Sequence, residues 1–481
     1  MKVDDLLDTA SFPEFGIERW RALAEKALGG GSVDEALTSL SDDRIAMAAL
    51  EQRRRNAVPF AARSDSSATW AVTQRVDDPD PGRANRQALE DVAQGATGLA
   101  LVFEGAHNAF GNGLPAKPEA LAVALHNVPL NRLYLRIDAH PASRASVDWL
   151  VALLGKRRVD PSKLSVSFGI DPAAIFASAG WLRMSVGALK ASMPQSLAHF
   201  FALGLPGILL EGDGRIFHNA GATEAQELGI AIASAVSHLR MFEEARQPLV
   251  YAAPHIGFSL AVDQDQFVSM AKLRALRLLW ARVTEACSIP SASVSIHAET
   301  SYRMLTARDA ETNVLRNTIA AFAAAVAGAD SISVVPHAAA HGLADPFARR
   351  IARNTQLILA DESHVGFVTD PAAGSGNVEA LTDALCAKAW EEFQRIEAEG
   401  GILDSLLAGK IQARIAGAAK DRARLYQSGQ RQIVGTTVFP AAVERHVATL
   451  PAARRSAKEE GAVFCQRLAP QRLDELAEAS R

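Results

Sequence analysis

The feature of this sequence that most constrains its fold is a regular alternation of short apolar runs and longer stretches with helical periodicity. Between the runs lie roughly 25 to 45 residues in which apolar side chains mostly recur at positions i, i+3 and i+4. Alternating strands and helices predict right-handed crossovers and a parallel sheet. The eight runs are Leu99–Phe103, Leu133–Asp138, Leu164–Phe168, Gly207–Leu210, His255–Leu260, Ser293–Ile296, Ser331–Val335 and Val365–Thr369.

The number of runs distinguishes between α/β architectures. Eight strand–helix repeats over ~270 residues match a closed (β/α)8 TIM barrel, and strands buried on both faces form short continuous apolar runs, as these do. An open doubly wound sheet is the alternative, because periodicity does not count strands reliably. We expect a barrel over residues 70–400, an N-terminal helical arm and linker over residues 1–69, and a helical C-terminal extension over residues 401–481.

The segments outside the expected barrel have simpler patterns. Ile17–Leu28 places apolar side chains at helical spacing and ends at three glycines, and Ser64–Ser67 is typical of a linker. This helix can pack on its own domain or reach a partner, and the sequence leaves both open. At the other end, Gly401–Gln427 is expected to be helical, Gln432–Phe439 to form a strand, and the remainder to form a charged helix to Arg481.

Composition excludes several classes of partner. The formal net charge of −4 gives no electrostatic reason to expect binding to nucleic acid or to an anionic membrane. Cys287, Cys386 and Cys465 are far apart, so neither disulfides nor a zinc ribbon is expected, and a reducing cytoplasm fits best. The segment Met1–Asp5 does not begin a secretory signal. The longest uncharged run, Ala191–Leu210, contains two prolines and is expected to be a buried helix and strand, not a membrane span.

A glycine-rich turn, Asp370–Gly376, is the first candidate binding site. It follows the eighth apolar run and precedes a helix, so its backbone N–H groups could hold a phosphate where barrels often do. A plain tight turn is the alternative. The motifs G-x-x-x-x-G-K-[ST] and G-x-G-x-x-G are both missing from the sequence, so nucleotide hydrolysis and Rossmann chemistry are not indicated.

Two histidines four residues apart are the next candidate. His337 and His341, with Asp345, have the spacing of metal ligands on one helical face. Gly342 and Pro346 interrupt that helix, however, and no fourth ligand is nearby. The favoured interpretation is a polar loop that lines a cleft after the seventh run, so no metal is expected.

Several long stretches resemble acyl-CoA mutases of the methylmalonyl-CoA mutase family. They cover roughly Trp70 to Gly401 and are Phe267–Trp280, Ile351–Leu357, Asp370–Pro371, Gly374–Ser375, His218–Ala222 and Trp70–Asp80. The resemblance implies a radical isomerase in which an acyl-CoA threads the barrel and a C-terminal flavodoxin-like domain presents adenosylcobalamin at its mouth. The N-terminal segment resembles the arm that wraps around the partner subunit in this family. Family members with two unlike subunits pair an active chain with a degenerate one.

Departures from the family pattern indicate the degenerate kind of chain. In Trp70–Arg75, Arg75 stands where the active chains' W-T-I-R-Q-Y carries its tyrosine. Aligned without gaps through Ala220–Ala222, Ile216 stands where Y-H-x-x-E-A-G-A carries the catalytic histidine, and His218 lies two positions away. Neither a long cation nor a hydrocarbon can act as a general acid on a thioester carbonyl. No catalytic residue is therefore expected in this chain.

The remaining site residues are carried over from the same resemblance. His297 ends the sixth run and matches a family histidine, but Glu299 replaces a glutamine beside it. With Arg75 and His218, these residues would line a degenerate acyl-CoA cleft.

The sequence also departs from the family in its cobalamin motif. Around His364, Glu362 and Phe367 occupy the aspartate and glycine positions of the cobalamin-ligating motif D-x-H-x-x-G. Beyond Pro440 no strand–helix alternation continues, so the corrin-binding domain is expected to be missing. We expect this chain to bind no cofactor, and a partner to hold the adenosylcobalamin.

Three functions remain open. The leading hypothesis is the small, non-catalytic subunit of a heterodimeric mutase, an isomerase of methylmalonyl-CoA and succinyl-CoA, which stabilises a catalytic large subunit through a large interface. The second is a catalytic acyl-CoA mutase subunit that uses a separate cobalamin-binding protein, which Arg75 and Ile216 argue against. The third is an unrelated barrel lyase, for which no lysine or metal set is evident. The sequence leaves open whether CoA binds to this chain and which acyl group is handled. It also does not distinguish a heterodimer from a homodimer.

Overall fold

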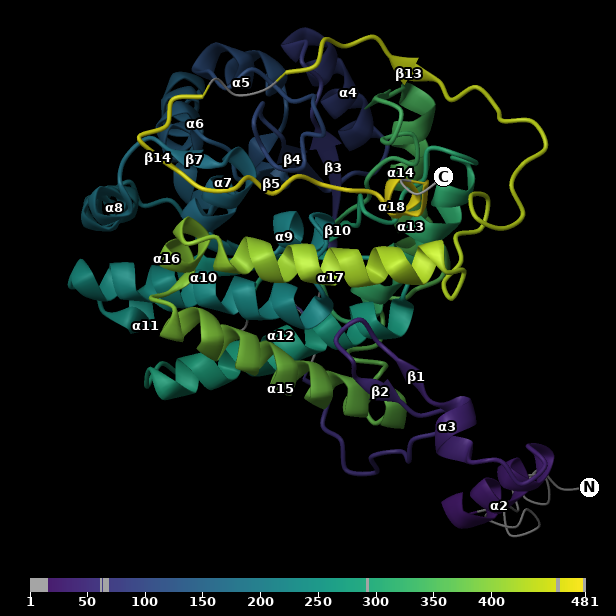
Figure 1. Ribbon diagram of the computed structural model, residues 1–481. Coiled ribbons are helices and arrows are strands. Elements are labelled where there is room, and N and C mark those ends of the chain that lie inside the picture. The colour runs from purple at the N-terminus through teal and green to yellow at the C-terminus, as the bar shows by residue number, and fades with distance from the viewer. Residues whose placement is uncertain (1–15, 61–62, 64–68, 291–293, 456–458, 479–481) are drawn as a thin grey trace, which may run out of the picture.

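A closed barrel of eight parallel strands lies at the centre of the computed structural model, which describes residues 16–60, 63, 69–290, 294–455 and 459–478 (Figure 1). The strands neighbour one another in the order β10-β11-β3-β4-β5-β6-β8-β9. They are β3 (Ala71–Val76), β4 (Gly98–Leu101), β5 (Tyr134–Ile137), β6 (Ser165–Ile170), β8 (Ile208–Asp213), β9 (Ile256–Val262), β10 (Ile296–Thr300) and β11 (Ser331–Ser333). The predicted (β/α)8 barrel is confirmed, and the open sheet is excluded.

One of the eight predicted strands is wrong, and one barrel strand was missed. Val365–Thr369 is not a strand but lies in turns that follow a π-helical turn (η5, Ile358–Glu362), with Phe367 89% exposed. The missed strand is β3, which pairs with β4 and β11. It escaped the search for apolar runs because half of its residues are polar, although five of its six residues are buried. Consequently the loop around His337 follows the last barrel strand, and the turn at Asp370–Gly376 follows none.

Helices surround the barrel, and several begin where a proline follows an aspartate. Asp80, Asp171 and Asp345 accept hydrogen bonds from backbone N–H groups of the first turn, and proline fits the next position because its missing N–H is not needed there. The helices are α4 (Pro81–Ala93), α5 (Pro118–Ala124), α6 (Ser143–Arg157), α7 (Pro172–Ala179), α8 (Val186–Ala202), α9 (Arg215–Asn219), α10 (Glu224–Glu244), α11 (Leu249–Ala252), α12 (Gln266–Ala286), α13 (Thr312–Val326) and α14 (Pro346–Leu357). Short 3-10 turns are η2 (Leu130–Arg132), η3 (Pro161–Lys163) and η4 (Ala253–His255). The run Ala191–Leu210 divides into α8 and β8, as predicted.

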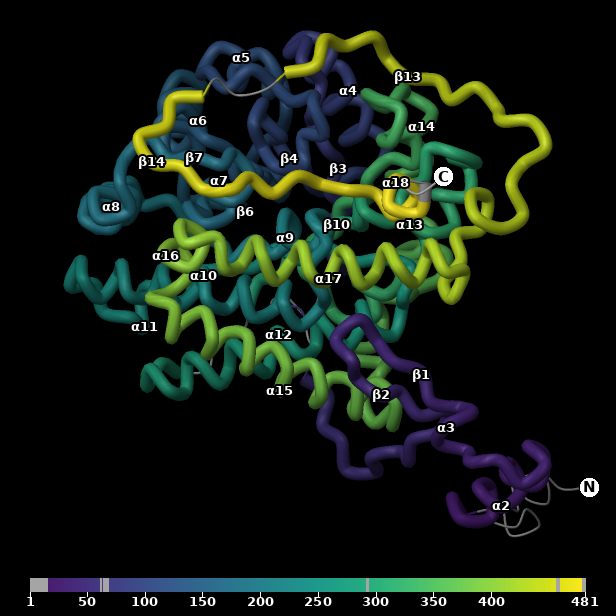
Figure 2. The backbone as a smooth tube through the Cα atoms, in the orientation of Figure 1, coloured from purple at the N-terminus to yellow at the C-terminus, as the bar shows by residue number. Residues whose placement is uncertain are grey.

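The chain after the barrel first runs back along its side and then crosses its mouth (Figures 1 and 2). α15 (Gly376–Ala398) packs on α10 and α12, and α16 (Ile402–Leu407) and α17 (Lys410–Gln427) follow as predicted. Residues 449–455 and 459–472, here called the strap, are mostly extended. Their short strands β13 (Thr449–Leu450) and β14 (Val463–Phe464) pair with β12 (Leu343–Ala344) and β7 (Trp181–Leu182), and α18 (Leu473–Glu478) ends the described chain.

Two expectations for this region are therefore wrong. Gln432–Phe439 forms a turn in which only Val434 and Val438 make an isolated bridge, not a strand. The expected charged helix is mostly the extended strap, and only α18 is helical. The reason is tertiary, because the strap pairs with barrel loops that are more than a hundred residues away in sequence, which overrides local propensity.

The N-terminal arm projects away from the barrel (Figure 1). The predicted helix is α2 (Ile17–Ala27), and none of its residues is buried. α3 (Val33–Leu37) and a hairpin of β1 (Ser39–Leu40) and β2 (Ala46–Met47) follow, and the hairpin contacts the body through Asp42, which pairs with Arg422 at 2.6 Å. The segments Met1–Asp5 and Ser64–Ser67 lie outside the described residues. Among the described helices none is long and apolar enough to cross a membrane.

Candidate functional site

The interior of the barrel is polar, where most barrels of this kind pack branched aliphatic side chains. Charged side chains from strands that are not neighbours meet there, so they point toward the barrel axis. Arg136 on β5 reaches Glu211 on β8, and Arg75 on β3 reaches Glu299 on β10. All four side chains are buried. The centre of the fold is thus a set of ion pairs.

The pair of Arg136 and Glu211 is held by several hydrogen bonds. Arg136 donates from Nη1 and Nη2 to the two carboxylate oxygens of Glu211 at 2.6 and 2.7 Å, and from Nε to Asp138 at 2.6 Å. The hydroxyl groups of Ser167 and Ser259 also donate to Glu211. A buried carboxylate that accepts four hydrogen bonds needs no further partner.

Further charged side chains extend this network. Arg215 donates to Asp213 at 2.7 Å and to Asp138 at 2.9 Å. Arg75 donates from Nη1 to Glu299 at 2.8 Å, and its guanidinium group lies over the ring of Phe110. Further hydrogen bonds join the network: Asn108 donates to Asp138 and Glu299, and His107 Nε2 lies 2.9 Å from Asp213.

The arginines decide the charge state of the buried acids. Burial alone would raise the pKa of Asp138, but Arg215 and Arg136 hold it well below its usual range. Asp213 is affected in the same way by Arg215 and His107, so its pKa is also lowered. Burial, with Arg136 and Arg215 nearby, lowers the pKa of His297, whose Nδ1 lies 2.8 Å from the Ser331 hydroxyl. The interior therefore holds ionised acids, cationic arginines and a neutral His297.

The structure brings three of the four predicted cleft residues into one interior. Arg75, His297 and Glu299 belong to the barrel core, where His297 is the second residue of β10 and does not end it. His218 is also buried but makes other contacts, because its Nδ1 lies 3.1 Å from Glu227 and its Nε2 lies 2.8 Å from Ser301 Oγ, neither of which belongs to the ion pairs of the barrel interior.

The surroundings of His218 form the only cluster of three potential metal ligands among the described residues, with Glu224 and Glu227. Lys272 Nζ pairs with both carboxylates, and Arg303 donates to Glu224 at 3.0 Å. The ammonium group thus stands where a cation would bind, and the cluster does not fit a metal.

The other predicted candidates also have protein partners. His341 Nε2 lies 2.7 Å from the Ala307 carbonyl oxygen, His337 is buried edge-on against Phe347, and Asp345 caps α14. This arrangement fits the polar-loop interpretation. His364 lies on an exposed turn whose neighbour Gly366 approaches the start of β3, at the end of the barrel opposite the mouth.

The glycine-rich turn is filled by another part of the chain. Gly374 donates to Glu379 at 3.0 Å, and a Cβ added at Gly376 would lie 2.5 Å from the Gln52 carbonyl oxygen. Asp370 is paired with Arg274. The turn therefore presents a carboxylate and backbone carbonyls where a phosphate would need donors, so the alternative of a structural turn is favoured over a phosphate site.

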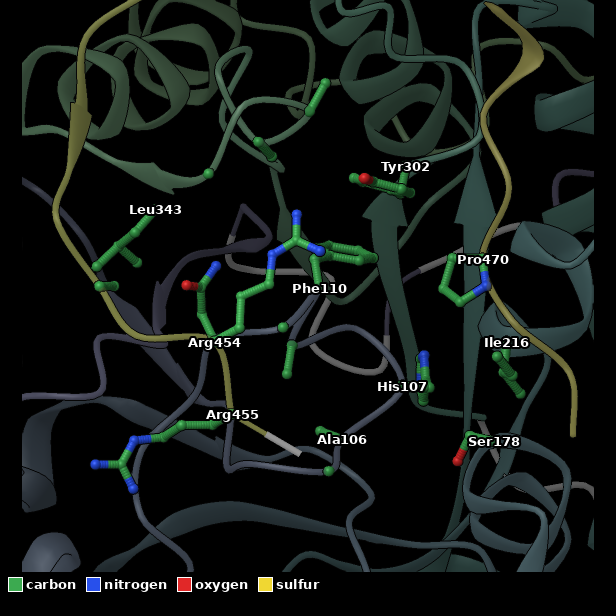
Figure 3. A pocket seen from close by; sticks show the side chains of 18 of the residues that line it. Ala106, His107, Phe110, Ser178, Ile216, Tyr302, Leu343, Arg454, Arg455 and Pro470 are labelled. Carbon is green, nitrogen blue, oxygen red and sulfur yellow. The ribbon is translucent and has the colours of Figure 1, made fainter. Parts of the chain in front are cut away.

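Sequence reasoning missed most of the barrel network. Arg136 and Asp138 lie within a run that was interpreted only as an apolar strand, and Glu211 follows directly after the run Gly207–Leu210. The signal was present, because Arg136 and Asp138 are two residues apart and residues at that spacing on a strand face the same side. Ile216 lies at the start of α9 with 0% exposure, and above it a cavity of about 1100 Å³ separates the mouth from the strap (Figure 3).

Comparison with known proteins gives one consistent result. The sequence model of the family described as methylmalonyl-CoA mutase matches residues 116–478. The chain is 35% identical over 470 residues to the methylmalonyl-CoA mutase small subunit of Streptomyces virginiae, covering 93% of this chain and 74% of that protein. It is 43% identical over 305 residues to a probable methylmalonyl-CoA mutase small subunit of Mycobacterium tuberculosis (strain ATCC 25618 / H37Rv), covering 61% of this chain and 48% of that protein. Identity to the methylmalonyl-CoA mutase large subunit of Streptomyces virginiae is 33% over 265 residues, 54% of this chain and 36% of that protein.

Proposed function

The chain belongs to the methylmalonyl-CoA mutase family, and we propose that it is the small, non-catalytic subunit of a two-subunit mutase. The similarity to a small subunit extends over 93% of the chain, whereas the similarity to a large subunit of the same organism extends over 54%. In the complex, the large subunit interconverts methylmalonyl-CoA and succinyl-CoA. The function of this chain is to stabilise that partner.

The filled barrel interior is the observation that carries this proposal. An acyl-CoA that threads a barrel needs free space along its axis. Here Arg136 and Glu211 meet across the interior, and Arg75 and Glu299 form a second pair across it. Removing one partner of such a buried pair costs about 3–5 kcal/mol, so opening the interior for a ligand is strongly unfavourable. A barrel of this kind supports a structural role and argues against bound CoA.

The residues at the two positions compared with catalytic residues, Arg75 and Ile216, cannot act as general acids. The Arg75 guanidinium is engaged with Glu299 and Asp77, and an arginine stays protonated throughout the pH range of enzymes. Ile216 carries a hydrocarbon and is fully buried. General acid catalysis needs a group that can release and regain a proton near neutral pH. The alternative of a catalytic subunit with a separate cobalamin-binding protein is therefore not favoured, and family membership excludes the unrelated lyase.

The described residues do not fit a corrin. The strap crosses the mouth of the barrel, and its backbone donates to loops there, including Arg455 N to Gly111 O and Leu468 N to Ala177 O. The near match to the cobalamin-ligating motif, around His364, lies at the opposite end. We propose that adenosylcobalamin is held by the large subunit, and we derive no step through it in this chain.

The N-terminal arm supports the assignment of a protein partner. α2 has no buried residue, so Leu23 within it and Leu28 directly after it expose apolar side chains. Exposed apolar side chains on a projecting helix are typical of a segment that is covered in a complex. The cysteines are free, as a cytoplasmic location would require.

Co-expression with a mutase large subunit from the same source organism tests the proposal. Light scattering of the purified sample should give a one-to-one complex, and the complex should turn over methylmalonyl-CoA for longer than the large subunit alone. A homodimer of this chain that does not bind the large subunit would contradict the proposal. So would a large subunit that has the same activity and lifetime with and without this chain.

A further inference from the structure

The cavity above the barrel mouth has a floor and a roof from distant parts of the chain (Figure 3). The floor is formed by the loop after β4, including Ala106 and His107, and by Ile216. The roof is the strap, which contributes Arg454, Arg467 and other residues. At about 1100 Å³, the cavity is slightly larger than the usual small-molecule site of about 300–1,000 Å³.

His107 is the buried polar group on the floor. Its side chain is 1% exposed, and its Nε2 lies 2.9 Å from Asp213. Its Nδ1 has no hydrogen-bond partner among the described residues. A buried polar atom without a partner is costly unless a ligand or water satisfies it. In the imidazolium form both ring nitrogens donate, so Nδ1 could donate to an acceptor in the cavity.

The arginines of the cavity divide into two kinds. Arg455 pairs with Glu104 at 3.3 Å, and Arg472 pairs with Glu475 at 3.0 Å. Arg454 and Arg467, in contrast, have no carboxylate partner within the part of the chain that the structure describes.

Each unpaired arginine is nevertheless positioned by the protein. The side chain of Arg454 lies against Gly111, where an added Cβ would be 3.6 Å from its Cδ. Arg467 donates from Nε to the Ser178 carbonyl oxygen at 2.8 Å, which leaves its two terminal nitrogens for another acceptor. Two acidic residues line the cavity: Glu475 is paired with Arg472, and Glu459 would oppose an anion.

We propose that this cavity binds a small organic oxyanion, a carboxylate or a phosphate, between His107 on the floor and Arg454 and Arg467 of the strap. Guanidinium groups bind both kinds of oxyanion through paired N–H donors. A bound anion would join the roof to the floor, so ligand binding would stabilise the described residues of the strap against local opening. This inference goes beyond the role of a structural subunit and does not depend on it.

Isothermal titration of the purified full chain with pyrophosphate and, separately, with succinate tests the site. We expect one site at low ionic strength for at least one of the two anions, and the anion that binds identifies the phosphate or the carboxylate as the source. Arg454→Ala and Arg467→Ala should each weaken binding about tenfold, the value for a lost hydrogen bond to a charged group. Both side chains are exposed, so the variants should keep the thermal midpoint of the wild type.

Arg455→Ala is the matched control, because it removes a cavity arginine that already has a carboxylate partner. Its affinity should stay within about twofold of the wild type. Hydrogen exchange of residues 449–455 and 459–472 should slow when the anion binds. Failure of both anions to bind at about 10 mM, or equal binding by the Arg454→Ala/Arg467→Ala double variant, would overturn the proposal.

Discussion

Removing Arg136 should destabilise the protein more than removing any surface arginine. Arg136 and Glu211 are both buried, and the guanidinium group donates two hydrogen bonds to the carboxylate. In Arg136→Met the Glu211 carboxylate would keep only the hydroxyl groups of Ser167 and Ser259. An uncompensated buried charge costs about 3–5 kcal/mol.

The same reasoning predicts the opposite result for the double variant. Arg136→Met/Glu211→Met replaces both charges with apolar groups of similar length, a change that is often neutral or stabilising in buried pairs. The unfolding entropy of about 2.1 cal/mol/K per residue over 481 residues gives about 1 kcal/mol per degree for a single cooperative transition. The single variant should therefore lower the thermal midpoint by about 3–5 °C. The double variant should recover the part of that loss that comes from the unpaired Glu211, while Asp138 keeps Arg215 as its partner.

Differential scanning calorimetry of the wild type, both single variants and the double variant measures this cycle. Arg282→Met is the control, since its partner Glu285 is 71% exposed and such pairs contribute less than about 1 kcal/mol. A single variant as stable as this control would refute the reasoning. So would a double variant that unfolds at the same temperature as Arg136→Met.

Three further perturbations have clear expected outcomes. Burial lowers the pKa of His238 to about 4, whereas a histidine in the unfolded chain has a pKa of about 6.5. Between these two pH values the unfolded chain binds a proton at this residue and the folded chain does not. The His238 contribution to stability is therefore lost as the pH falls from about 6.5 toward 4, by up to about 3 kcal/mol. His238→Gln should make the fall of the thermal midpoint across that range less steep. Gly207 has a φ of 94°, and an added Cβ would overlap the Val166 carbonyl oxygen. Gly207→Ala should therefore lower the free energy of unfolding by more than about 2 kcal/mol on calorimetry. Gly187→Ala is the control, because Gly187 lies in α8 with open space around it, and this variant should be as stable as the wild type or slightly more stable. Leu23→Asp should leave the thermal midpoint of the isolated chain unchanged, because α2 buries no residue, but should weaken its complex with the large subunit on size-exclusion chromatography.

The sequence predicted the barrel because its strands are mostly apolar and buried on both faces. It did not identify β3, since Thr73, Gln74 and Arg75 are polar, and it placed a strand at Val365–Thr369, where apolar residues are exposed in a turn. A run of apolar residues indicates a strand that is buried against apolar side chains, but β3 is buried against charged side chains. A strand that faces a polar interior is therefore invisible to that test.

The site was predictable only in part for a related reason. The motif around Trp70 identified Arg75, and its neighbour across the interior, Glu299, was also singled out. The separation of His218 from His297 depends on which side of a strand or helix each residue faces, which spacing over eighty residues does not fix. The strap was missed because its pairing with β12 and β7 is entirely non-local.

The proposed role requires that the barrel of this chain does not catalyse the mutase reaction, and one turnover measurement tests this directly. The purified chain is mixed with methylmalonyl-CoA, adenosylcobalamin and a separate cobalamin-binding protein, without any large subunit, and succinyl-CoA is measured. A filled interior with Arg75 and Ile216 at the compared positions predicts no succinyl-CoA above the background without this chain. Formation of succinyl-CoA in proportion to the amount of this chain would contradict the claim.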